Sequence, residues 1–150
     1  MFLRIVGLII IAIFFASWAN ACEDPKEEIE VLALNIYHEA RDQGYDGMLL
    51  VGEVTINRVE SDSFPNDVCG VVYQRSQFSW NTQISNPEPQ EEAAWELALE
   101  IAEDIYNYEI ERFNNGATHF VNPSELNVTP RWVNVLERVG HYGDHVFYRE

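Results

Sequence analysis

Residues 46–59 constrain the fold of this chain more than any other segment, because apolar side chains cover nearly every face of the helix that they predict. A helix of this kind must be packed on all sides, so we expect it to be the buried central helix of the domain. Glu53 and Asn57 are polar positions within it, and their spacing places both on one face. Buried polar groups need partners, which favours a structural or supporting role for Glu53 beside Asn57. The apolar positions are Met48, Leu49, Leu50, Val51, Val54, Ile56 and Val59.

The preceding segment, residues 27–41, predicts an amphipathic helix. Glu39 lies at the edge of its apolar stripe and His38 lies on the far side. We therefore expect Glu39 to border the core, His38 to face water, and Tyr37 to belong to the core rather than to a ligand site. The stripe follows the spacing of one helix face at Ile29, Leu32, Ala33, Ile36, Tyr37 and Ala40.

The remaining segments predict a mostly helical domain with a small antiparallel sheet. Asp67 is the predicted N-cap of a short helix that reaches Tyr73, and residues 91–108 predict a long helix. Residues 77–80 fit either a short strand or an ordered loop. Together the segments predict one α-rich domain of the α+β class. Strands are predicted at residues 117–121 and 145–148, and turns or loops at 63–66, 86–89, 114–116, 123–130 and around Gly140 and Gly143.

A carboxyl group beside an apolar helix face suits one particular chemistry. An enzyme that cleaves glycans needs a carboxyl group in a partly apolar cleft, where burial raises the pKa and keeps the group protonated at neutral pH. Glu39 is the candidate for this group.

The formal net charge of the 150-residue chain is −16. Binding to nucleic acid requires a basic face, so this charge argues against nucleic acid as a partner. It also fits poorly with tight binding to an anionic polymer. The simplest explanation is a well-solvated acidic surface.

The N-terminus has the layout of a secretory signal peptide. Arg4 precedes an apolar run over residues 5–19, and Ala19–Asn20–Ala21 resembles a cleavage site. We expect residues 1–21 to be a signal peptide and residues 22–150 to be the exported domain. Two alternatives stay open, an uncleaved membrane anchor and a lipoprotein acylated at Cys22.

Cys22 and Cys69 are the only cysteines of the chain. Two alternatives stay open. In an exported protein the two cysteines could form one disulfide. Cys69 could instead be a small buried apolar residue. Cys69 has no nucleophile motif and no basic neighbour, which argues against a cysteine hydrolase built with His119 or His145.

The sequence contains no recognisable set of metal ligands. His38–Glu39 begins the zinc-protease pattern H-E-x-x-H, but Asp42 stands where the second histidine is required. The four histidines, at positions 38, 119, 141 and 145, show no metal-site spacing. We expect neither a metal nor another cofactor.

Short motifs in a fixed order extend over nearly all of residues 22–150. They are residues 36–41 (IYHEAR), 47–59 (GMLLVGEVTINRV), 64–66 (FPN), 68–74 (VCGVVYQ), 77–80 (QFSW), 116–120 (GATHF) and 143–149 (GDHVFYR). This set resembles the SleB/CwlJ-type cell wall hydrolases, known from the spore cortex-lytic enzymes and from related bacterial and phage proteins.

The resemblance implies a lysozyme-like fold and cleavage of peptidoglycan glycan strands. It implies that Glu39 is the catalytic acid of a lytic transglycosylase. Such enzymes cut the β-1,4 bond from N-acetylmuramic acid to N-acetylglucosamine and leave a 1,6-anhydro end. The expected partner is therefore the glycan strand of peptidoglycan, bound by a monomer in the periplasm, the cell envelope or the extracellular space.

Further residues are candidates for substrate binding. Gln77, Phe78 and Ser79 offer amide, aromatic and hydroxyl groups for a sugar-binding wall, although Phe78 and Trp80 fit core packing equally well. Thr118 and His119 match the A-T-H segment of the family and are expected to face the cleft, whereas His145 is expected to orient backbone or to pack. Glu53 and Asn57 complete the candidate set.

Two other functions stay open. If Glu53 supplied a second carboxylate, the chain would be a hydrolytic, muramidase-type glycosidase, because ordinary glycosidases use two carboxyl groups. The domain would otherwise be a non-catalytic peptidoglycan-binding protein of the envelope. The presence of Glu39 in the E-A-R context argues against this last reading.

Overall fold

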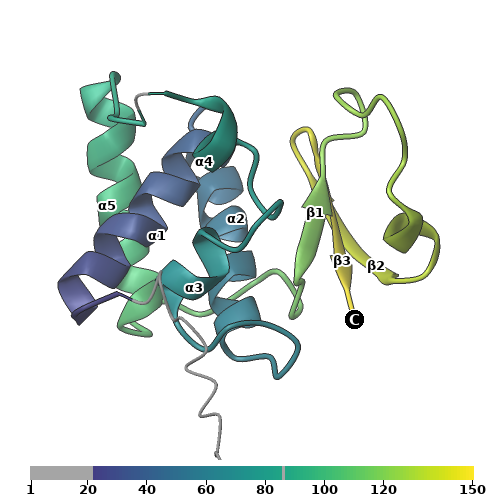
Figure 1. Cartoon of the computed structure of the whole chain (residues 1–150), viewed down its shortest axis with the longest axis horizontal. Helices are drawn as coiled ribbons and strands as arrows, with labels where there is room; N and C mark the ends of the chain where they lie inside the picture. The colour runs from purple at the N-terminus through teal and green to yellow at the C-terminus, as the bar shows by residue number, and fades with distance from the viewer. Residues whose placement is uncertain (1–21, 86) are drawn as a thin grey trace, which may run out of the picture.

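Helices and strands occupy two separate parts of the molecule, which lie side by side (Figure 1). The computed structural model describes residues 22–85 and 87–150, so the predicted signal peptide at residues 1–21 lies outside the described residues. The α-helices are α1 (Pro25–Ala40), α2 (Gly44–Val59), α3 (Val68–Val72), α4 (Trp80–Gln83) and α5 (Glu92–Tyr106). The strands are β1 (His119–Val121), β2 (Glu137–Tyr142) and β3 (His145–Arg149), and a 3-10 helix, η1 (Arg131–Asn134), precedes β2.

The central helix α2 packs against α1, α3 and α5, and most of its side chains are buried. Gly52 permits this packing, because a Cβ atom there would lie 2.8 Å from the side chain of Ile36 on α1 and 2.7 Å from that of Ile105 on α5. Helix α1 begins at Pro25, where Asp24 accepts a hydrogen bond of 2.9 Å from the backbone N–H of Glu27. The predictions for α1, α2 and α5 are confirmed.

A buried polar link fixes α4 against α1. The side chain of Asn35 donates to the hydroxyl of Thr55 over 3.1 Å and accepts from the indole N–H of Trp80 over 2.8 Å. The buried indole therefore has a hydrogen-bond partner. The short helix α4 begins at Trp80. Of the two predictions for residues 77–80, the short strand is wrong and the ordered loop holds up to Ser79.

The sheet is antiparallel with the strand order β1-β3-β2. The strands β1 and β3 were expected, but β2 was not, because the sequence placed a turn around Gly140. Gly140 instead lies within β2, next to an irregularity in its pairing with β3, and only Gly143 lies in the tight turn, with a φ of +53°. Most side chains of β2 are exposed, so the strand lacks the alternation of apolar and polar residues that identifies a half-buried strand.

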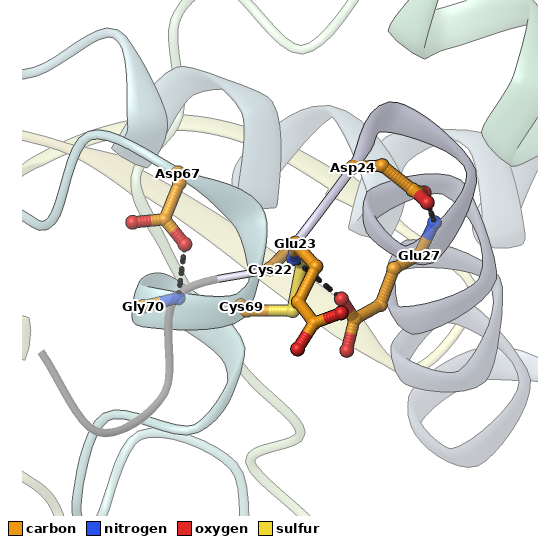
Figure 2. The surroundings of a disulfide bond; sticks show 7 residues. All are labelled: Cys22, Glu23, Asp24, Glu27, Asp67, Cys69 and Gly70. Atoms are coloured by element: carbon orange, nitrogen blue, oxygen red, sulfur yellow. Dashed lines mark hydrogen bonds between the residues drawn. A yellow bond between two sulfur atoms is a disulfide. The ribbon is translucent and has the colours of Figure 1, made fainter.

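A disulfide joins Cys22 to Cys69, and their Cα atoms are 5.3 Å apart. Figure 2 shows that it ties the segment in front of α1 to the short helix α3. The side chain of Asp67 caps α3 by accepting a 2.7 Å hydrogen bond from the backbone N–H of Gly70, as the sequence predicted. Of the two predictions for the cysteines, the disulfide is confirmed.

The sheet is attached to the helices by a small apolar cluster of Val54, Ala117 and Phe147. A second cluster on the sheet contains Val121, Val146 and Tyr148 and packs against Trp132 of η1. Within the described part of the chain, none of the helices has the length and apolar character needed to span a membrane.

Candidate active site

A cleft of about 760 Å³ lies between the helices and the sheet. Its walls come from the C-terminal turn of α1, from α4, from β1 with the loop that follows it, and from the start of β3. The polar side chains on these walls include His38, Glu39, Ser79, Asn122, Glu125 and His145.

Glu39 lies in the last turn of α1, half-buried at the edge of the core as the sequence predicted. Burial raises the pKa of its carboxyl group to about 7, because the charged form loses its solvation. The positive charge of Arg58 opposes this rise, and the negative charge of Glu125 adds to it. Glu39 can therefore carry a proton near neutral pH, which a general acid requires.

His38 does not face water, so this prediction is wrong. Its Nε2 donates a 2.7 Å hydrogen bond to the carbonyl oxygen of Pro87, and its ring stacks on Trp80 with the ring centres 4.8 Å apart. Helix α4 and the segment that begins at Pro87 cover this side of α1, which the periodicity of one helix cannot reveal. Burial lowers the pKa of His38, so the imidazole is neutral at pH 7.

Tyr37 belongs to the core, as expected. Its hydroxyl oxygen accepts hydrogen bonds from the backbone N–H groups of Gln90 and Glu91, at 3.0 Å and 3.2 Å. It thus anchors the segment in front of α5 to α1.

The three candidates in residues 77–79 have different positions. Ser79 is exposed and lines the cleft. Phe78 is buried and lies against the guanidinium of Arg58, so it packs in the core. Gln77 is half-buried and lies outside the cleft lining.

The described residues that line the cleft do not include Thr118 or His119. Thr118 is buried, and its hydroxyl lies 3.0 Å from Nδ1 of His119. The ring of His119 packs between Phe64 and Trp132, with centre distances of 5.9 Å and 4.9 Å. The structure therefore does not bring these two candidates into the cleft lining: their side chains pack and bond with their neighbours.

Glu53 and Asn57 also lie away from the cleft. Glu53 is fully buried, and its carboxylate accepts hydrogen bonds from the backbone N–H groups of Phe113 and Asn114. Asn57 donates 2.8 Å hydrogen bonds to the side chain of Asn114 and to the carbonyl oxygen of Ala117. The structure therefore does not bring these two candidates into the cleft with Glu39. Both residues hold the turn before β1, in line with the supporting role favoured for Glu53.

His145 lies at the start of β3 and lines the cleft from the side of the sheet. The residue is buried, and its ring packs against Phe120 with the ring centres 5.0 Å apart. Burial lowers the pKa of His145, so this imidazole is also neutral at pH 7. Its position agrees with the expected packing role.

Arg58 was not singled out in the sequence, although it is the only charged residue besides Glu53 in the apolar part of the central helix. The structure buries it within electrostatic reach of Glu39. The available signal was a permanent charge in a helix expected to be buried, since such a charge needs a partner. The described residues contain no group of three His, Cys, Asp or Glu side chains that would suit a metal ion.

Comparison with known proteins gives a consistent result. The model of the cell wall hydrolase family matches residues 42–148, which begin three residues after Glu39. The spore cortex-lytic enzymes of Halalkalibacterium halodurans and Bacillus subtilis are each 28% identical to the chain over 120 residues. These matches cover 80% of the chain and 34% and 37% of the two enzymes. The chain thus spans little more than a third of these relatives.

Two solved structures cover most of the chain. The catalytic domain of the germination-specific lytic transglycosylase SleB from Bacillus anthracis has 27% identity and a TM-score of 0.66, covering 81% of this chain and 93% of that domain. The catalytic domain of the Bacillus cereus SleB protein has 26% identity and a TM-score of 0.68, covering 87% and 96%. These similarities confirm the predicted lysozyme-like α+β fold.

Proposed function

Because the chain belongs to the cell wall hydrolase family, we propose that it cleaves the glycan strands of peptidoglycan as a lytic transglycosylase, with Glu39 as its catalytic acid. The observation that carries this proposal is the half-buried carboxyl group of Glu39 in a large cleft, with a pKa raised to about 7. The matches to the two solved SleB catalytic domains cover 93% and 96% of those domains.

The reaction needs one carboxyl group that acts twice. Glu39 first gives its proton to the oxygen between the two sugars as the bond from that oxygen to C1 of N-acetylmuramic acid breaks. The carboxylate then takes the proton of the C6 hydroxyl of the same sugar as the oxygen of that hydroxyl bonds to C1. A 1,6-anhydro ring and a free hydroxyl on the leaving sugar result, and Glu39 regains its proton. No water molecule is consumed.

Two uncharged polar side chains of the cleft suit a sugar chain. Ser79 and Asn122 offer a hydroxyl and an amide group. Such groups donate and accept hydrogen bonds without a fixed charge. We assign Ser79 and Asn122 to glycan binding in place of Gln77, Phe78, Thr118 and His119.

A hydrolytic reaction is the second candidate, and one observation favours it. Glu125 lines the same cleft and acts electrostatically on Glu39. It is therefore the second carboxyl group that a muramidase would use, in the place first considered for Glu53.

We also propose export to the cell envelope, with residues 1–21 as the signal peptide. The disulfide supports this, because such bonds persist in oxidising compartments. It also counts against a lipoprotein, since the thiol of Cys22 is already bonded to Cys69. Intact-mass measurement of protein recovered from the envelope tests this. Loss of 19–21 residues supports a signal peptide, whereas a full-length chain in the membrane fraction indicates an anchor.

The deciding experiment is mass analysis of the muropeptides released from purified sacculi. Anhydro ends support the transglycosylase, reducing ends indicate the hydrolase, and the absence of products indicates a binding protein. A parallel incubation with EDTA tests the proposal that the monomer needs no cofactor. Loss of activity that zinc restores would contradict that part of the proposal.

A further inference from the structure

Arg58 places a permanent charge in the interior of the domain. Its side chain is 4% exposed, and its guanidinium lies 5.2 Å from the ring centre of Phe64 and 5.1 Å from that of Phe78. Nε donates a 2.6 Å hydrogen bond to the carbonyl oxygen of Thr118, but Nη1 is buried and has no partner within the described part of the chain. A buried charge is unfavourable unless it is compensated, so this position calls for a negative group.

Two carboxyl groups act on this guanidinium. The larger effect comes from Glu39 on α1, and the smaller one comes from Glu150, which follows β3. Glu150 is exposed, so solvent and salt screen it, whereas Glu39 is half-buried. His119 on β1 also faces Arg58, but burial and the guanidinium itself lower the pKa of that imidazole and keep it neutral.

We propose that Arg58 is a positioning residue for glycan cleavage, whose buried guanidinium stabilises the carboxylate that Glu39 becomes after it has given up its proton. This inference rests on the proposed function. It concerns the interval between the two proton transfers, when C1 has lost its leaving group and the C6 hydroxyl has yet to bond. During this interval Glu39 is negative in a site that excludes much of the water.

Opposing effects set the proton affinity of Glu39. Burial and the charge of Glu125 raise the pKa of the carboxyl group, and Arg58 lowers it. A group that serves first as acid and then as base works best when its pKa lies near the working pH. Without Arg58, Glu39 would hold its proton more firmly and would be a poorer donor of that proton to the oxygen between the two sugars.

Three variants separate charge from packing. Arg58→Gln removes the charge and keeps an amide donor for the carbonyl oxygen of Thr118. Arg58→Lys keeps the charge in a smaller head group. Arg112→Met is the matched control, because Arg112 forms its ion pair with Glu60 at 2.8 Å and lies outside the cleft lining. If Arg58→Gln does not fold, Arg58→Met takes its place as the uncharged variant.

Each variant is tested by two measurements. Titration of the carboxyl carbon of Glu39 by ¹³C NMR reports the proton affinity directly, and turnover of sacculi against pH reports the reaction. For the uncharged variant we expect the titration midpoint and the basic limb of turnover to move up by about one pH unit, with turnover falling about tenfold. Arg58→Lys and Arg112→Met should show the same titration midpoint of Glu39 and the same basic limb of the turnover profile as the unaltered protein.

The outcomes distinguish this proposal from the proposed function. An unchanged midpoint in the uncharged variant, or an equal rise in Arg58→Lys, overturns the role of Arg58. A shifted midpoint without a shifted limb also overturns it, because Arg58 would then not act in the reaction. If the unaltered protein releases no muropeptides, the proposed function fails and this inference about the reaction falls with it, whereas the NMR titration still measures the effect of Arg58 on Glu39.

Discussion

The carboxylate of Glu53 accepts a 2.7 Å hydrogen bond from the backbone N–H of Asn114, and so joins the central helix to the turn that leads into β1. The neighbouring N–H of Phe113 donates to the other carboxylate oxygen over 2.8 Å. Both oxygens of this buried group are thus engaged by backbone. Glu53 holds the helical part and the sheet together at the point where the chain crosses from one to the other.

Glu53→Gln should reduce stability and leave the chemistry intact. The amide group of glutamine would turn an N–H₂ toward a backbone N–H, leaving a buried donor without an acceptor. We expect a loss of about 1–3 kcal/mol in the free energy of unfolding, measured by urea denaturation. Glu103→Gln on the exposed face of α5 is the control and should change little. A folded Glu53→Gln protein without activity would contradict this role.

Glu39→Gln should abolish cleavage without disturbing the fold. The substitution keeps the shape of the side chain and removes the proton that the leaving sugar needs. General acid–base catalysis typically contributes a factor of about 10²–10⁴ to the rate, so turnover of sacculi should fall by a factor of about 10² or more. Circular dichroism checks the fold, and Glu103→Gln again serves as the control. Nearly normal turnover by Glu39→Gln would refute its assignment as catalytic acid.

The activity should decline as the pH rises through about 7. Burial raises the pKa of Glu39 to that value, and the first step needs the protonated form. The measurement is kcat/KM against pH on solubilised glycan strands, since this ratio reports the free enzyme. A basic limb beyond pH 9 would point to another group as the acid.

The disulfide should make a clear contribution to stability. The two cysteines are 47 residues apart, so the bond closes a long loop in the unfolded chain. Replacing both Cys22 and Cys69 with serine should lower the free energy of unfolding by about 2–4 kcal/mol. Thermal unfolding with and without a reductant measures this. If a reductant lowers the melting temperature of the serine variant as much as that of the unaltered protein, the effect does not come from the disulfide.

The helices of the fold follow from local patterns in the sequence. Periodic burial, the Asp67 cap and the turn at residues 114–116 predict most element positions, because each reflects interactions between near neighbours in the chain. Strand β2 does not follow from a local pattern. Its mostly exposed side chains show no alternation of apolar and polar residues, and its position depends on pairing with β3.

The candidate site was predictable only in part, for a related reason. Glu39 could be identified from its position on one helix. Glu125 and His145 come from two other parts of the chain, and only the folded structure brings them to the same cleft and places Arg58 within electrostatic reach of Glu39. His38 illustrates the limit, since the phase of α1 says nothing about the segment that covers it.

Glu39→Gln should also change how the stability of the protein depends on pH. The folded protein raises the pKa of Glu39 from an ordinary value of 4.5 to about 7, so the native state binds this proton more tightly than the unfolded chain does. The resulting stability is fully present below pH 4.5 and is lost as the pH rises through 7. The loss amounts to about 3 kcal/mol at most.

Glutamine resembles the protonated form at every pH and should escape this loss. The free energy of unfolding of Glu39→Gln, relative to the unaltered protein, should therefore rise between pH 4.5 and pH 8. Other titrating groups are common to both proteins and largely cancel in the difference. Urea denaturation at both pH values, with Glu103→Gln as a pH-independent control, provides the measurement. An equal difference at the two pH values would mean that the carboxyl group of Glu39 titrates as if it were in water.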